Sequence, residues 1–150
     1  MNGRLNREPL KILLVEDSPS DIDLTKEALD EGKVIHELFV VEDGVAAMQF
    51  LNREGVYADV PRPDLVLLDL NLPQKDGREV LAEIKTTPKL KRLPVIVLTT
   101  SAAEEDVCST YEHHANCYIT KPVDVEEFIR VVRSLGEFWL SFVRLPPTCQ

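Results

Sequence analysis

Five polar side chains in this chain could act together on a phosphoryl group, because each comes directly after a short apolar run. They are an acidic pair, a third acid, a hydroxyl and a lysine: Glu16, Asp17, Asp69, Thr99 and Lys121. Three neighbouring carboxylates repel one another unless a divalent cation receives them, and Mg²⁺ (or Mn²⁺) binds carboxylate and phosphoryl oxygens together. The lysine adds a positive point charge suited to phosphate, and a carboxylate can be the nucleophile toward phosphorus.

Each of these residues also has an ordinary structural explanation when taken alone. An acidic pair after a strand is favoured by the dipole of the next helix, and a threonine there often caps a turn. Asp69 is the hardest to explain in this way, because Asn71, Pro73 and Gly77 already supply the turn residues. The joint occurrence of all five after apolar runs favours a functional site.

The elements that must position these residues follow from the hydrophobic pattern. Short apolar runs predict strands, and amphipathic runs between them predict helices. The expected strands are 11–15, 36–41, 64–68, a run within 91–100, and 117–120, and the expected helices lie within 16–32, 43–53, 76–85, 101–114 and 123–140. Alternation of five strands with five helices predicts an α/β, doubly wound parallel sheet with helices on both faces. In such sheets the carboxyl ends of the strands form the ligand crevice, so the five side chains should meet there.

Local signals add detail to the first two helices. Ser18 can cap the first helix, with Asp21 in the position of a capping-box acid. The second helix is expected to have its apolar face at Val45, Met48 and Leu51, with Phe50 on its flank.

Composition excludes several function classes. The 150-residue chain has a formal net charge of −9, which argues against nucleic acid as a partner. No apolar run approaches the length of a membrane span, and the first residues lack the apolar core of a secretory signal. Cys108, Cys117 and Cys149 have no pairing pattern, as expected of reduced thiols in the cytoplasm.

The joint pattern resembles the receiver domain of response regulators in two-component signalling. The matching segments are the acidic pair, "LLDLNLP", the "DG" at 76–77, "VIVLTT" and "YITKP", so that the resemblance covers residues 11–135. It implies a flavodoxin-like sheet of order 2-1-3-4-5. It further implies that Asp69 takes a phosphoryl group from the phosphohistidine of a histidine kinase, with self-catalysed transfer and slow autodephosphorylation as the only chemistry.

The resemblance also assigns roles around Asp69. Asp17, Asp69 and the backbone carbonyl of Asn71 would ligate magnesium, and Glu16 would act through a metal-bound water. Lys121 would pair with Asp69 and then with the phosphoryl group, across a cis bond to Pro122.

Thr99 and Tyr118 resemble the switch pair of this family. A phosphoryl oxygen would draw in the Thr99 hydroxyl, and Tyr118 would move into the space it leaves, changing the nearby protein surface. Tyr118 is otherwise explained as a half-buried core aromatic.

Loops 53–63 and 86–94, "HHANCYITKPVD" and the long final helix most resemble the small regulators paired with cyanobacterial phytochromes. A phytochrome is therefore the expected kinase. Residues 1–10 are expected to be an extension, and 136–150 an aromatic extension with no separate output domain. That aromatic segment either packs on its own core or forms a homodimer face, and dimerisation is the favoured expectation.

Two rival functions use similar residues. A small-molecule phosphatase resembling the haloacid dehalogenase group would need an acid where Asn71 stands, and would need a cap segment. A phosphorylation-independent pseudo-receiver would only bind a partner, and it would have no need for the full set of polar residues.

Overall fold

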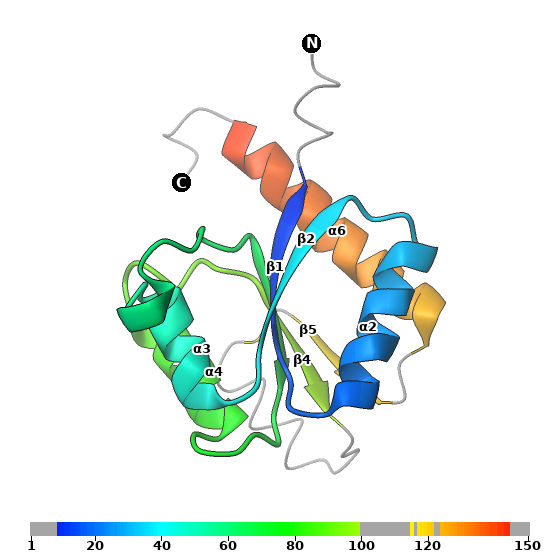
Figure 1. The fold of residues 1–150 in the computed structure, drawn as a ribbon. Coiled ribbons are helices and arrows are strands. Elements are labelled where there is room, and N and C mark those ends of the chain that lie inside the picture. The colour runs from blue at the N-terminus through cyan, green and yellow to red at the C-terminus, as the bar shows by residue number, and fades with distance from the viewer. Residues whose placement is uncertain (1–8, 100–114, 116, 122–123, 145–150) are drawn as a thin grey trace.

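The computed structural model describes residues 9–99, 115, 117–121 and 124–144, with side chains except those of 117 and 135–144. Its described part contains a five-stranded parallel sheet of order β2-β1-β3-β4-β5 (Figure 1). The strands are β1 Leu10–Val15, β2 His36–Val41, β3 Leu65–Asp69, β4 Val95–Thr99 and β5 Cys117–Thr120. The predicted doubly wound fold and its strand order are confirmed.

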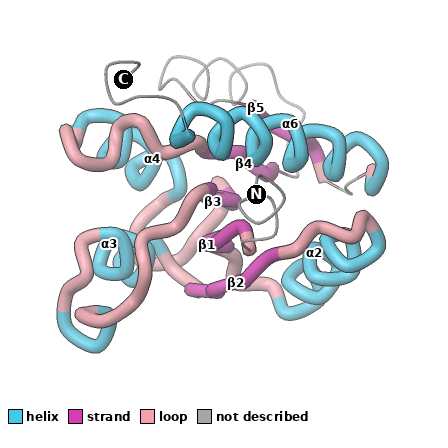
Figure 2. The backbone as a smooth tube through the Cα atoms, turned by 90° about the horizontal axis from the view of Figure 1, so that it is seen from above, coloured by secondary structure: helices cyan, strands magenta, loops and turns pink. Residues whose placement is uncertain are grey.

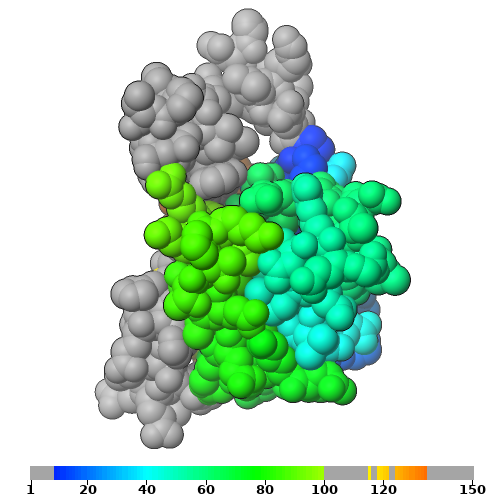
Figure 3. Space-filling model, turned by 90° about the vertical axis from the view of Figure 1, so that its left-hand side faces the viewer, coloured from blue at the N-terminus to red at the C-terminus, as the bar shows by residue number. Residues whose placement is uncertain are grey.

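Helices cover both faces of the sheet (Figure 2). α2 (Pro19–Glu31) and α6 (Val125–Arg144) lie on one face, and α3 (Gly44–Leu51) and α4 (Gly77–Thr86) on the other. Each face has its own apolar cluster, one beneath α2 and α6 and one beneath α3 and α4. Figure 3 shows the molecule from the side of α3 and α4, whose segments form one continuous surface. A 3₁₀ turn, η1 (Gly55–Tyr57), follows α3, and the helix predicted at 101–114 lies outside the described residues.

β3 is the central strand, and every residue in it is buried. The run from Leu65 to Leu68 is at most 1% exposed, as expected for a strand covered on both faces. Its neighbours are in register, with Leu68 opposite Val15 of β1 and Asp69 opposite Leu98 of β4. The carboxyl ends of these strands therefore lie side by side, where they can hold a common site.

The predicted apolar face of α3 is wrong in part. Val45 is 44% exposed, whereas Phe50, expected on the flank, is 3% exposed. The buried stripe passes through Ala47, Phe50 and Leu51, which helical spacing places on one side, about 120–160° from Val45. Phe50 is held inward by the rings of Phe39 and Tyr57 at centroid distances of 5.7 and 5.4 Å.

Helix caps agree better with the sequence. The Ser18 side chain accepts a hydrogen bond from the backbone N–H of Asp21, which confirms the predicted start of α2. α4 begins with a full capping box between Asp76 and Glu79. Within the part of the chain that the structure describes, no helix combines the length and apolar character needed to cross a membrane.

Candidate functional site

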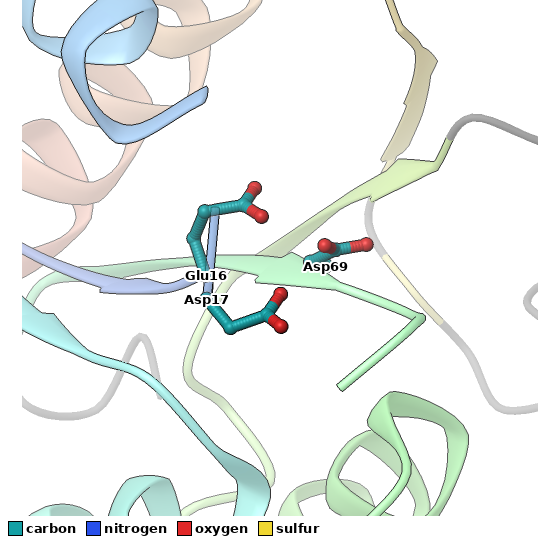
Figure 4. Close-up of side chains that lie close together, drawn as sticks. All are labelled: Glu16, Asp17 and Asp69. Carbon is teal, nitrogen blue, oxygen red and sulfur yellow. The ribbon is translucent and has the colours of Figure 1, made fainter. Parts of the chain in front are cut away.

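Three carboxylates gather where β1 and β3 end. Glu16, Asp17 and Asp69, here called the carboxylate trio, each have a side-chain oxygen within 4.8 Å of the others (Figure 4). Glu16 and Asp69 are 1% and 5% exposed, whereas Asp17 is open to solvent. The prediction that these three acids lie close together is therefore confirmed.

The backbone around Asp69 is fixed from two sides. The N–H of Asn71 donates to Asp69 Oδ1 at 3.1 Å, and the N–H of Leu70 donates to the carbonyl of Leu98 at 3.3 Å. Gly77, the first residue of α4, approaches so closely that a Cβ there would lie 2.3 Å from the Asp69 carbonyl oxygen. A glycine at this position lets α4 begin directly against the end of β3.

Lys121 brings the positive charge of the site from the end of β5. Its backbone N–H donates to the carbonyl of Thr99 at 2.6 Å. Its Nζ donates to Glu16 Oε1 at 2.7 Å, to Asp21 Oδ2 at 2.9 Å and to Asp69 Oδ2 at 3.4 Å. The pairing with Asp69 expected from the sequence is present, but it is the longest of the three contacts.

The charges of the site shift the pKa values of its members. Burial raises the pKa of Glu16 to about 7; the Asp69 carboxylate adds to this effect, and the hydrogen bond from Lys121 opposes it. Burial by itself would lower the pKa of Lys121, but its hydrogen bonds to Glu16 and Asp21 raise that pKa above the ordinary lysine value. Lys121 is therefore a permanent cation at neutral pH.

Asp21 is the member of the site that sequence reasoning missed. It was expected to close a capping box, yet its carboxylate accepts from Lys121 instead. The available signal was its position: an acid in the first turn of a helix that starts at the carboxyl edge of the sheet, next to the expected lysine.

The remaining predicted residues are only partly placed. Thr99, the last residue of β4, is 2% exposed and lies opposite Thr120 of β5. Tyr118 is half-buried and packs against the apolar cluster beneath α3 and α4. Pro122 and its expected cis bond lie outside the described residues.

The donor chemistry of the carboxylate trio fits a hard divalent cation. Its members offer only oxygen atoms, which Mg²⁺ and Mn²⁺ prefer, and two of the three carboxylates are buried. Lys121 supplies one positive charge against these acids, so a divalent ion would complete the neutralisation.

The response regulator receiver domain model matches residues 12–133 of the chain. The chain belongs to this receiver domain family. Response regulator Rcp1 of Synechocystis sp. (strain PCC 6803) is 54% identical to this receiver over 138 residues, which cover 92% of this chain and 94% of Rcp1.

Solved structures of relatives agree with the receiver fold. The phosphorylated cyanobacterial phytochrome response regulator RcpA is 54% identical, with a TM-score of 0.77 over 93% of this chain and 99% of that one. The Mn²⁺-bound form of Rcp1 is also 54% identical, with a TM-score of 0.76 over 92% of this chain and 99% of that one. One of these relatives has thus been seen phosphorylated, and the other with a divalent metal.

Proposed function

We propose that Asp69 is the phosphoacceptor of this receiver and takes its phosphoryl group from the phosphohistidine of a histidine kinase. The observation that carries the proposal is the environment of the Asp69 carboxylate. One oxygen accepts from the N–H of Asn71 and the other from Lys121, and the whole group is buried within the carboxylate trio. A nucleophile in this position is oriented before the donor arrives.

In the transfer, an Asp69 oxygen attacks phosphorus, the P–N bond to the kinase imidazole breaks, and a P–O bond forms an acyl phosphate. The imidazole nitrogen keeps the electron pair of the broken bond. Lys121 donates to the phosphoryl oxygens as their charge arrives at the site. Autodephosphorylation reverses the state by hydrolysis of the acyl phosphate, and no other substrate is turned over.

A divalent cation, when bound, neutralises charge on the phosphoryl oxygens. Asp17, Asp69 and the backbone carbonyl of Asn71 would hold it, with Glu16 acting through a metal-bound water. Support for this assignment comes from the oxygen-only donor set. The Mn²⁺-bound structure of Rcp1, a 54% identical relative, points the same way.

We propose Thr99 and Tyr118 as the switch pair. Thr99 is buried at the end of β4, two residues after Val97, which lies opposite Tyr118 in β5. In the phosphorylated state the Thr99 hydroxyl would donate to the phosphoryl group. Tyr118, half-buried at present, would then turn further inward and alter the surface around β5.

We further propose that the kinase partner is a phytochrome and that the exchange takes place in the cytoplasm. Support for the phytochrome comes from 54% identity to RcpA, a cyanobacterial phytochrome response regulator. Support for the compartment comes from three cysteines without a pairing pattern.

A homodimer formed by the aromatic segment 136–150 is also proposed. Its sequence gathers Phe138, Trp139, Leu140 and Phe142, the residue types enriched in interface cores. Light scattering should report a dimer for the full chain and a monomer for a chain cut at Gly136. A shortened chain that stays dimeric would contradict this assignment.

The phosphoacceptor is tested by intact mass after incubation with acetyl phosphate and magnesium. The wild type should gain one phosphoryl group, about 80 Da, labile to hydroxylamine. Asp69→Asn should gain none, whereas Asp59→Asn, the same change at an exposed position, should behave as wild type. No adduct on the wild type at any magnesium concentration would favour the pseudo-receiver, and an adduct on Asp69→Asn would place the acceptor elsewhere.

The phosphatase alternative is not favoured. The family match covers residues 12–133, and Asn71 stands where the dehalogenase group places its second acid. Steady turnover of a small phosphoester by the wild type, lost in Asp69→Asn, would be needed to restore it.

A further inference from the structure

The Lys121 ammonium contacts three acids, and its contact with Asp69, the proposed phosphoacceptor, is the longest of the three. An ammonium has three N–H donors. Here they face Glu16, Asp21 and Asp69 at 2.7, 2.9 and 3.4 Å. The side chain of Lys121 is only 9% exposed, so little water competes for these donors. Two of the three acids therefore hold the ammonium more closely than Asp69 does.

Asp21 differs from the other two acids because it is outside the carboxylate trio. It belongs to the first turn of α2, and its backbone is held at both ends. The Ser18 hydroxyl accepts from its N–H at 3.3 Å, and the Thr25 hydroxyl donates to its carbonyl at 3.0 Å. The backbone that carries the Asp21 carboxylate is thus held in place, and the carboxylate's described contact with the site is through Lys121.

Packing does not by itself fix the ammonium in this position. Asp21 and Lys121 both line a cavity of about 220 Å³ between α2 and α6, whose apolar wall includes Leu98 and Phe128. Space therefore exists on the α2 side of the lysine. The balance of attraction among the carboxylates sets where the ammonium rests.

We propose that Asp21 is a positioning residue that restrains Lys121 in the unphosphorylated protein and so slows phosphoryl uptake by Asp69. The restraint rests on the proposed phosphoacceptor function. To contact the phosphoryl oxygens, Lys121 must weaken its bond to Asp21, and this loss opposes the transfer. Removing the Asp21 charge frees the ammonium for Asp69 and for the incoming group.

The test compares Asp21→Asn with Asp23→Asn, the same change at an exposed position two residues along α2. The initial rate of adduct formation from acetyl phosphate and magnesium is measured by intact mass at fixed ionic strength. Asp21→Asn should react about fivefold faster than wild type, the effect expected from losing one partly exposed ion pair. Asp23→Asn should differ from wild type by less than about twofold, since its charge is screened by solvent and salt.

A second readout follows Lys121 itself, without magnesium or phosphodonor. The NMR signal of its ammonium, identified by its loss in Lys121→Arg, should shift in Asp21→Asn and stay in place in Asp23→Asn. Cooperative thermal unfolding of each variant confirms that it is folded.

The outcomes separate the two proposals. A wild type that takes no phosphoryl group overturns the phosphoacceptor function and the restraint with it. A phosphorylated wild type with Asp21→Asn no faster than Asp23→Asn overturns the restraint alone. An unmoved Lys121 signal in Asp21→Asn also overturns the restraint, because the ion pair would then be absent.

Discussion

Burial of Glu16 should make the metal-free protein less stable as pH rises. The pKa of Glu16 is about 7 in the folded protein and 4.5 for an ordinary glutamate. Between these values the folded state binds more protons than the unfolded state, so the free energy of unfolding falls with rising pH. The stability that Glu16 contributes is fully present below pH 4.5 and is lost as the pH rises through about 7. At about 1.4 kcal/mol per pKa unit, the loss is about 3 kcal/mol.

The assay is urea unfolding from about pH 5 to about pH 8 in the presence of EDTA, for wild type and Glu16→Gln. Glutamine keeps the shape of the side chain and an oxygen that accepts from Lys121, but it does not titrate. Relative to wild type, the variant should gain about 2.5 kcal/mol across this interval, because part of the total loss falls below pH 5. Glu37→Gln, the same change at an exposed position in β2, should leave the profile unchanged.

Parallel profiles for wild type and Glu16→Gln would refute this reasoning. They would mean that Glu16 is ionised in the folded state throughout the range, with Lys121 compensating its burial in full. Glu16 would then be fully ionised at pH 7, whereas a pKa of about 7 leaves only about half of it ionised there.

Three further predictions concern the site and its supports. Mn²⁺ should raise the midpoint of thermal unfolding more at about pH 8 than at about pH 5.5, because carboxylates must be ionised to bind a metal. Equal rises of the midpoint at the two pH values would contradict a metal site built on the carboxylate trio. Gly77→Ala should cost about 1–3 kcal/mol in urea unfolding and impair phosphorylation of Asp69, since its Cβ would meet backbone at 2.3 Å. Gly55→Ala is the control, because a Cβ there meets nothing within 4 Å; it should cost about 1 kcal/mol, from the positive φ alone, and leave phosphorylation intact. Equal effects of the two changes on phosphorylation would argue that the close approach of Gly77 to Asp69 does not matter. Asp43→Ala should cost about 1 kcal/mol in the same assay by removing the cap on Ala46, and an unchanged midpoint would show that the cap contributes nothing.

Much of the fold could be predicted from local pattern. The alternation of short apolar runs with amphipathic ones gave the strands β1 to β5, because a strand covered on both faces needs an uninterrupted apolar run. The positions of Glu16, Asp69 and Lys121 followed from one rule, that parallel strands end at the same edge.

The parts that could not be predicted depend on contacts between distant residues. Asp21 was assigned to a helix cap because that partner is near in sequence, whereas its actual partner, Lys121, is 100 residues away. The burial of Phe50 and Val45 was predicted the wrong way round for a similar reason. Helical spacing allows either to face inward, and the rings of Phe39 and Tyr57 decide between them.

The edge position of β5 gives the site members unequal local stability. β5 has four residues and pairs only with β4 among the described strands, whereas β3 lies between β1 and β4. Native proteins open in parts, and short edge elements open at a lower free-energy cost than central ones. Fraying of β5 would withdraw Lys121 while Asp69 stayed in place, so hydrogen exchange should be faster at Ile119 than at Leu67. The site would lose its positive charge well before the sheet that carries its acids unfolds.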